Sequence, residues 1–341
     1  YRYPFPAIQA SETVPVMVTT PEESVTSLVG VTKPESGWPV IIFVHAIGAD
    51  RTTSLPLANA LSAACIATDA EGNPIGASGL PCFATVAIDQ PLHGVAAQGS
   101  RIPGIVGVSD PDFEVAAGTG VGDNLPSNTL RERHYDFTLG ADGTAVPMNY
   151  TTDFGESGSM FINLSSFVTA RDNLKQMVID LLNVNASLDS MDLNDDGIAD
   201  ELDPGSVYMV GHSLGGNDGM PFVAINNSPA LQNSPYSAQP WIHAGAALNS
   251  GGGFARLLTN SGQFSSTILS GLNAASEGIL VPGSSSLETY LNTYQGVLDS
   301  ADITNFAPLL KDQNSATGVL FTQIEDDQTI PTAADSHWGN D

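Results

Sequence analysis

The chain has 341 residues, of which 42% are hydrophobic and 7% aromatic, so it can bury a substantial core within one large domain. Its 37 acidic residues outnumber its 10 Lys and Arg residues, which gives a formal net charge of −27. This charge argues against electrostatic binding to nucleic acids or anionic membranes. No apolar run approaches the roughly 20 residues of a membrane-spanning helix, so we expect no transmembrane segment.

Strand-like and helix-like stretches alternate along the chain. Runs rich in Val, Ile and Phe predict strands that are covered on both faces, at 40–45, 83–89, 207–211, 241–248 and 318–325. Apolar residues spaced three and four apart predict helices at 54–65 and 165–183. The alternation predicts an α/β fold, a mostly parallel central sheet with helices on both faces, in a single domain over residues 1–341.

The two cysteines, Cys65 and Cys82, bracket a segment rich in turn-forming residues, CIATDAEGNPIGASGLPC. Its Gly, Pro and Asn residues lead us to expect no regular element between the cysteines. We expect a disulfide that closes this loop, and therefore an oxidising compartment. Two free thiols are the alternative.

Two stretches are too long to be ordinary connections between elements. Residues 95–160 are rich in Gly, Asp, Thr and Pro, and residues 251–316 combine that composition with short helical patches. Both follow the C-terminal end of a predicted strand, which is the edge where open α/β sheets bind ligands. We interpret 95–160 as a lid and 251–316 as a cap; surface loops without order are the alternative.

A serine between glycines follows the third predicted strand. The segment 211–215, GHSLG, fits the pattern G-x-S-x-G, and a glycine-containing helix start comes after it. The pattern predicts a sharp strand-to-helix turn that exposes the Ser213 hydroxyl above the sheet. The glycines are required because a side chain at either position would collide with the neighbouring strand or helix. Ser213 is therefore the candidate nucleophile, and an incidental turn is the alternative.

A serine nucleophile needs a base to take its proton, and the oxyanion that forms needs two N–H donors. The N–H of Leu214, directly after the serine, is the first predicted donor. The second should follow the strand 40–45, where His45-Ala46-Ile47 predicts the N–H of Ile47. Ala46 stands where similar loops carry glycine, which leaves the Ala46 N–H as the alternative. We interpret His45 as a structural, hydrogen-bonding histidine.

The acid and the base of such a triad follow the serine in that order. Asp327 comes just past the last predicted strand and is the candidate acid, with Glu325 and Asp326 as rivals. His337 is the histidine that follows Asp327, and chain order makes it the predicted base. The alternative is a catalytic histidine beyond Asp341.

An acidic segment, DLNDDGIADELD, lies directly before the strand that leads to the serine. Its oxygen donors have the spacing of a twelve-residue calcium loop, with Gly197 at the sixth position. The predicted ligands are the side chains of Asp192, Asn194, Asp196, Asp200 and Asp203 and the carbonyl of Ile198. The last position carries Asp in place of the usual Glu. We expect a structural Ca²⁺ here, and an acidic linker is the alternative.

Several stretches resemble the large extracellular lipase and lysophospholipase family of gamma-proteobacteria, within the α/β-hydrolase superfamily. The similarity covers about residues 12–332 and lies in GWPVIIFVHAIGADRTT, SSFVTARDNLKQMVIDLL, VYMVGHSLGG, LNSGGGFARLL, VLDSADITNFAP and IEDDQTIP. The resemblance implies an α/β-hydrolase fold and a secreted or cell-surface carboxylic ester hydrolase. In such an enzyme Ser213 is the nucleophile and Asp327 the acid.

These observations together predict a serine esterase or lipase that acts through an acyl-enzyme on lipid-like, short-to-medium acyl or polyester substrates. We expect a small-molecule ester or lipid as the partner, no nucleic acid, and no cofactor for catalysis. One alternative is an acyl hydrolase for another bond, such as a thioester or an amide. The other is a non-catalytic, calcium-stabilised surface module with the same fold.

Overall fold

A computed structural model describes residues 9–95, 132–140, 143–148, 157–235, 239–312 and 317–332. All five predicted strands form: β2 Trp38–Val44, β5 Ala84–Ile88, β8 Leu202–His212, β9 Ile242–Leu248 and β10 Gly318–Thr322. They belong to one six-stranded sheet in the order β1-β5-β2-β8-β9-β10. Neighbours from β5 to β10 are parallel. The sheet is therefore mostly parallel, as the sequence predicts.

The sixth strand, β1 (Val16–Thr19), was not predicted. It pairs antiparallel with β5 at one edge of the sheet. At the other edge, β10 carries three apolar side chains that are 39–54% exposed, Val319, Leu320 and Phe321. Among the described strands, only β9 pairs with β10.

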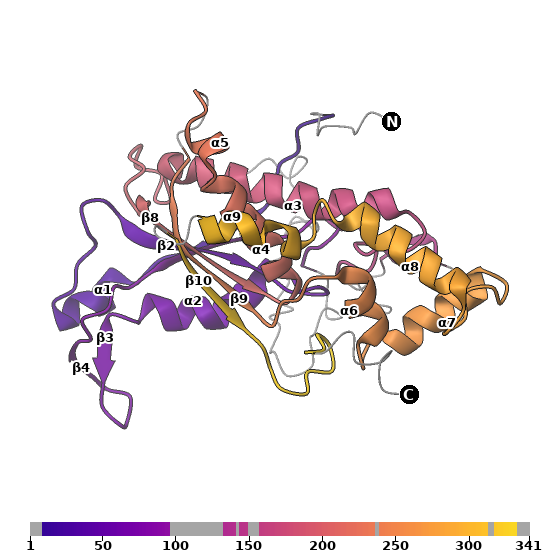
Figure 1. The fold of residues 1–341 in the computed structure, drawn as a ribbon. Coiled ribbons are helices and arrows are strands. Elements are labelled where there is room, and N and C mark those ends of the chain that lie inside the picture. The colour runs from indigo at the N-terminus through magenta and orange to yellow at the C-terminus, as the bar shows by residue number, and fades with distance from the viewer. Residues whose placement is uncertain are drawn as a thin grey trace.

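Helices connect the parallel strands and cover the sheet. In the view of Figure 1, α2 (Leu55–Ser62) lies below the sheet and α3 (Phe167–Ser187) above it. Both match the predicted helices, and α4 (Leu214–Asn226) begins directly after β8. This arrangement is the α/β-hydrolase fold that the resemblance implied. The shorter helices are α1 Glu23–Thr26, α5 Pro229–Gln232, α9 Ala307–Asp312, η1 Ser27–Val29, η2 Arg51–Ser54, η4 Leu188–Ser190 and η5 Ile303–Phe306.

The core consists of two clusters of buried apolar side chains. One is formed by side chains of the sheet and of the helices that cover it, and in this cluster Val40, Val86 and Val207 are completely buried. The other joins α3 to three helices from the predicted cap region. These are α6 Phe254–Asn260, α7 Ser265–Ala275 and α8 Ser285–Leu298. Figure 1 shows α6, α7 and α8 at the end of the molecule opposite the hairpin of β3 (Ile66–Thr68) and β4 (Pro74–Ala77).

The expectation of no regular element between the two cysteines was wrong. Strands β3 (Ile66–Thr68) and β4 (Pro74–Ala77) pair antiparallel within that segment. The turn between them is closed by Asp69, whose carboxylate accepts the N–H of Asn73 at 2.7 Å. Gly72 supplies a left-handed backbone, with φ of 86°. The turn-forming residues therefore connect two short strands, which are too brief to show a clear pattern in the sequence.

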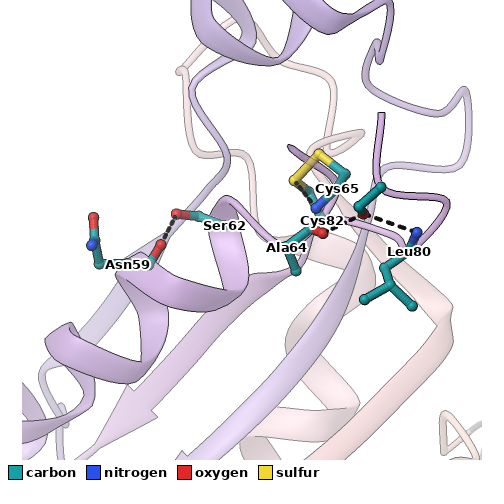
Figure 2. The surroundings of a disulfide bond; sticks show 7 residues. Asn59, Ser62, Ala64, Cys65, Leu80 and Cys82 are labelled. Atoms are coloured by element: carbon teal, nitrogen blue, oxygen red, sulfur yellow. Dashed lines mark hydrogen bonds between the residues drawn. A yellow bond between two sulfur atoms is a disulfide. The ribbon is translucent and has the colours of Figure 1, made fainter. Parts of the chain in front are cut away.

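The predicted disulfide between Cys65 and Cys82 is confirmed. Both cysteines are buried and belong to the sheet's apolar cluster. Figure 2 shows the neighbouring hydrogen bonds, including that from the Cys65 N–H to the Cys82 sulfur at 3.2 Å. The bridge therefore fastens the hairpin to the core.

Only part of the predicted lid 95–160 lies within the described residues. That part includes a small antiparallel pair, β6 (Phe137–Leu139) and β7 (Ala145–Pro147). Across the described ranges, no helix combines the length and the apolar character needed to cross a lipid bilayer.

We expect the double variant Cys65→Ala/Cys82→Ala to lose about 3 kcal/mol of unfolding free energy, because the bridge closes a loop of 17 residues. Urea denaturation of the variant and the parent measures the difference. A Ser62→Ala variant, which removes only a helix-surface hydrogen bond next to the bridge, is the control. Equal midpoints for all three proteins would contradict a stabilising bridge.

Candidate active site

Ser213 occupies the turn between β8 and α4. Its backbone has φ of 54° and ψ of −119°, a region that non-glycine residues rarely adopt. Its N–H donates to the carbonyl of Leu248, at the end of β9, with a distance of 2.7 Å. This is the strained strand-to-helix turn that the sequence predicted, and it places the serine above the sheet.

The glycines around the serine allow three backbone segments to approach closely. A Cβ at Gly211 would lie 2.3 Å from the carbonyl oxygen of Gly215. At Gly215 it would lie 2.0 Å from the carbonyl oxygen of Val44, and at Gly216 it would lie 1.9 Å from the hydroxyl of Ser250. Real Cβ atoms do not come this close to their neighbours, so the turn requires glycine at all three positions.

Ser250 was not singled out by the sequence analysis. Its buried hydroxyl donates to the carbonyl oxygen of Ser213 at 2.8 Å. The bond joins the loop after β9 to the turn after β8. Nothing in the sequence spacing indicates this contact, because it depends on the pairing of two strands.

A chain of hydrogen bonds fixes the loop that carries the predicted second oxyanion donor. The N–H of Gln90 donates to Nε2 of the buried His45 at 3.0 Å, so this nitrogen accepts and Nδ1 carries the proton. Nδ1 then donates to the carbonyl of Ala46 at 2.8 Å. Burial lowers the pKa of His45, which favours this neutral form. His45 is therefore a structural residue, as we interpreted it.

The bond to the Ala46 carbonyl also orients the next N–H. The described peptide bonds are all trans, and in a trans peptide the C=O and the following N–H point to opposite sides. Because the Ala46 C=O points at His45, the Ile47 N–H points away from it. Both Ala46 and Ile47 line the same cavity as Ser213, so the direction of the N–H is what separates them. This geometry favours Ile47 over Ala46 as the second donor.

The first predicted donor lies at the start of α4. Leu214 is the first residue of this helix, and the first N–H groups of a helix have no acceptor within it. The positive end of the helix dipole adds to the effect. The Leu214 side chain is buried in the apolar cluster that joins α3 to α6, α7 and α8, and this packing holds the backbone in place.

Ser213 opens into a cavity of about 1290 Å³. Its wall is mainly apolar, with side chains from the loop after β2, from the segment before α3, and from α6, α7 and α8. The apolar lining residues include Ile47, Ile162, Leu164, Phe167, Leu258, Phe264, Ile268, Leu272, Leu280 and Ile330. A cavity of this size and character suits a ligand with a long apolar part.

Asp327 lies in the wall of this cavity, whereas Glu325 and Asp326 are exposed and do not line it. One carboxylate oxygen of Asp327 accepts the N–H of Thr329 at 2.7 Å and that of Ile330 at 3.1 Å. The structure thus brings Asp327, and not its two rivals, to the same cavity as Ser213. These bonds orient the carboxylate and leave its second oxygen available for a histidine.

The predicted base, His337, lies outside the described residues. One described histidine, His212, lines the cavity. Burial lowers the pKa of His212, and the negative charge of Asp327 opposes that shift. His212 directly precedes the nucleophile in the chain, so it departs from the order that the triad pattern requires.

Buried charges tie residues 132–133, within the predicted lid, to the sheet and to α3. Arg51 donates to Glu132 at 2.7 Å and also contacts Asp89, and all three side chains are buried. Arg133 donates to Asp180 on α3 at 2.6 Å. The paired charges hold residues 132–133 next to the loops that carry His45 and Gln90. No local pattern predicts this network, because its members lie far apart along the chain.

The loop 192–203 shows part of the arrangement that a calcium site needs. Gly197 is left-handed, with φ of 87°, and its N–H donates to Asp192 at 2.7 Å. The carboxylate of Asp200, however, pairs with Lys33 at 2.6 Å, and that of Asp203 accepts the N–H of Gly205 at 2.9 Å. No three His, Cys, Asp or Glu side chains converge to hold a metal anywhere in the described ranges. The first half of the loop fits the pattern, and the last two predicted ligands are held by other partners.

We expect Gly215→Ala to destabilise the fold by about 1–3 kcal/mol, because the added methyl forces α4 away from β2. Chemical denaturation measures the loss. Gly296→Ala is the matched control, since a Cβ there meets nothing within 4 Å in the last turn of α8. That variant should gain stability by about 0.5–1 kcal/mol. If Gly215→Ala were as stable as the parent, the close approach would not be a constraint.

Comparison with known proteins adds distant structural neighbours. No family model and no curated sequence matches the chain. The acetyl xylan esterase from Paenibacillus sp. R4 is 13% identical with a TM-score of 0.42, over 92% of this chain and 74% of that one. The monoacylglycerol lipase of Paleococcus ferrophilus is 12% identical with a TM-score of 0.34, over 94% and 81%. The assignment of the α/β-hydrolase fold rests on the sheet order and on the turn at Ser213.

Proposed function

We propose that the chain is a serine-dependent carboxylic ester hydrolase of the esterase or lipase type. The observation that supports this most is the strained turn at Ser213, which opens into a large apolar cavity. A serine in that setting suits nucleophilic attack on an acyl group, and the apolar wall suits a lipid-like acyl chain. The Cys65–Cys82 disulfide supports a secreted or cell-surface location.

The proposed reaction has two halves. The Ser213 oxygen attacks the ester carbonyl while the base takes its proton, and the N–H groups of Leu214 and Ile47 hold the oxyanion. The intermediate expels the alcohol, which receives the proton from the base, and the acyl-enzyme remains. Water then attacks the acyl-enzyme and gives one proton to the base. When this second intermediate collapses, the base returns that proton to the Ser213 oxygen and the carboxylic acid leaves.

Asp327 would orient the base and stabilise its charged form. The base in this proposal is His337, because it is the histidine that follows the acid. The helices α6, α7 and α8 would act as the cap over the acyl chain, and the segment 95–160 as a lid.

We expect Ser213→Ala to abolish labelling by a fluorophosphonate and hydrolysis of a nitrophenyl ester. His337→Ala should lower kcat/KM by about three to five orders of magnitude. His243→Ala is the control, since His243 is exposed and bonds the Gly205 carbonyl near the start of β8, whereas Ser213 follows the end of that strand. A folded parent that neither takes the label nor hydrolyses the ester would refute the proposed function. If activity fell with His212→Ala and not with His337→Ala, the base would be assigned to His212.

The proposal includes a structural Ca²⁺ in the loop 192–203. Asp192, Asn194 and Asp196 would be its first ligands, and Asp200 would have to leave Lys33 to join them. Such an ion would pin the loop that leads into β8, and so the strand that carries the nucleophile.

We expect calcium to stabilise the fold by about 2.7 kcal/mol when its free concentration is about 100 times the dissociation constant. Thermal melting with calcium and with a chelator measures the shift. The variant Asp192→Asn/Asp196→Asn should melt at one temperature under both conditions. An unchanged melting temperature of the parent after chelation would remove calcium from the proposal.

A further inference from the structure

One face of α7 forms a wall of the cavity at Ser213. The residues of that face recur at spacings of three and four, so they lie on one side of the helix. They are Phe264, Thr267, Ile268, Gly271, Leu272 and Ala275. The wall is therefore a continuous helical surface, with only one glycine in it.

Helix α7 begins next to the loop that carries Asp327 and runs away from it. The N–H of Gln263, just before α7, donates to the carbonyl of Gln328 at 2.8 Å, and the hydroxyl of Thr329 donates to the Gln263 side chain at 2.6 Å. Both partners neighbour Asp327, so α7 begins at the catalytic end of the cavity. Because a helix rises 1.5 Å per residue, Gly271 lies about 10 Å along the axis from Phe264.

Gly271 leaves a gap in this wall. It lies inside α7, where glycine is a poor choice for helix stability, and a Cβ built there meets nothing within 4 Å. The positions next to it along the wall, Ile268 and Leu272, carry large side chains. Gly271 is exposed and lines the cavity, as do Ile268 and Ala275 on the same face of the helix. A side chain at this position would therefore project toward the cavity.

The charged residues that line the cavity restrict which lipid headgroups can bind there. No lysine or arginine lines the cavity among the residues that the structure describes, and Asp327 is the acidic residue that does. An anionic headgroup would therefore find no cationic partner in this wall and would meet the carboxylate of Asp327. An uncharged ester avoids both costs.

We propose that α7 guides the acyl chain of an uncharged ester and that Gly271 sets the longest chain the cavity accepts. The inference rests on the proposed ester hydrolase, because it places the ester group at Ser213. The chain then follows the wall of α7 from the end near Asp327 toward Gly271. Short acyl chains end before they reach this glycine, and long chains pass it.

The test compares the parent with Gly271→Leu on monoacylglycerols of butyrate, octanoate, dodecanoate and palmitate. The variant should keep the kcat/KM of the parent on butyrate within about twofold. On palmitate its kcat/KM should fall about tenfold, because the leucine side chain would keep roughly two methylenes of the acyl chain from being buried against apolar surface. Gly296→Leu, a glycine on α8 with equal free space that does not line the cavity, should keep the parent's chain-length profile.

Three results would overturn the inference. The first is an unchanged profile in Gly271→Leu, and the second is an equal loss on butyrate and palmitate. The third is hydrolysis of a palmitoyl lysophosphatidate as fast as that of monopalmitin, because the inference expects the anionic lipid to react at least about tenfold more slowly.

A binding measurement separates this inference from the proposed function. Glycerol monooctyl and monohexadecyl ethers carry no cleavable ester, so calorimetry reports chain binding without chemistry. In the parent the longer ether should bind more tightly, and in Gly271→Leu that advantage should fall about tenfold. An inactive parent that shows this pattern would refute the hydrolase and keep the chain site. An active parent without it would refute the chain site alone.

Discussion

The close approach of α4 to β2 is the contact on which the site depends. Gly215 lies against the carbonyl of Val44, with no room for a Cβ. This approach brings the start of α4, with the Leu214 N–H, next to the loop after β2, with the Ile47 N–H. Two backbone segments from distant parts of the chain thus meet beside Ser213. The strained backbone of Ser213 is maintained because the elements on both sides of it are packed rigidly.

Two further sets of contacts keep these loops in position. The His45 ring holds the Ala46 carbonyl on one side and the Gln90 N–H on the other, so the sheet sets the direction of the Ile47 N–H. On the other side, Leu214 packs into the apolar cluster that joins α3 to the cap helices. The nucleophile turn is therefore supported both by the sheet and by the helices that form the cavity. A change in the cap is transmitted to the oxyanion donors through packing.

Local patterns in the sequence predicted the parts that depend on nearby residues. The parallel strands, α2, α3, the turn at Ser213 and the Cys65–Cys82 bridge all follow from short-range periodicity or spacing. The hairpin β3–β4 was missed because its strands are too short to show a period. Ser250 and the contact of Arg51 with Glu132 were missed because strand pairing and long-range packing create them. The sequence already favoured Asp327 over Glu325 and Asp326, and the fold adds that Asp327 is the one of the three that lines the cavity.

The edge strand β10 has a consequence for how the molecule behaves at high concentration. Among the strands that the structure describes, only β9 pairs with β10, and an edge of this kind with exposed Val319, Leu320 and Phe321 is a template for pairing with another chain. The net charge of −27 opposes such pairing, because like-charged molecules repel each other. Salt shortens the reach of that repulsion to about 3 Å at 1 M. Colloidal stability in this protein is therefore electrostatic in origin, and ionic strength controls it.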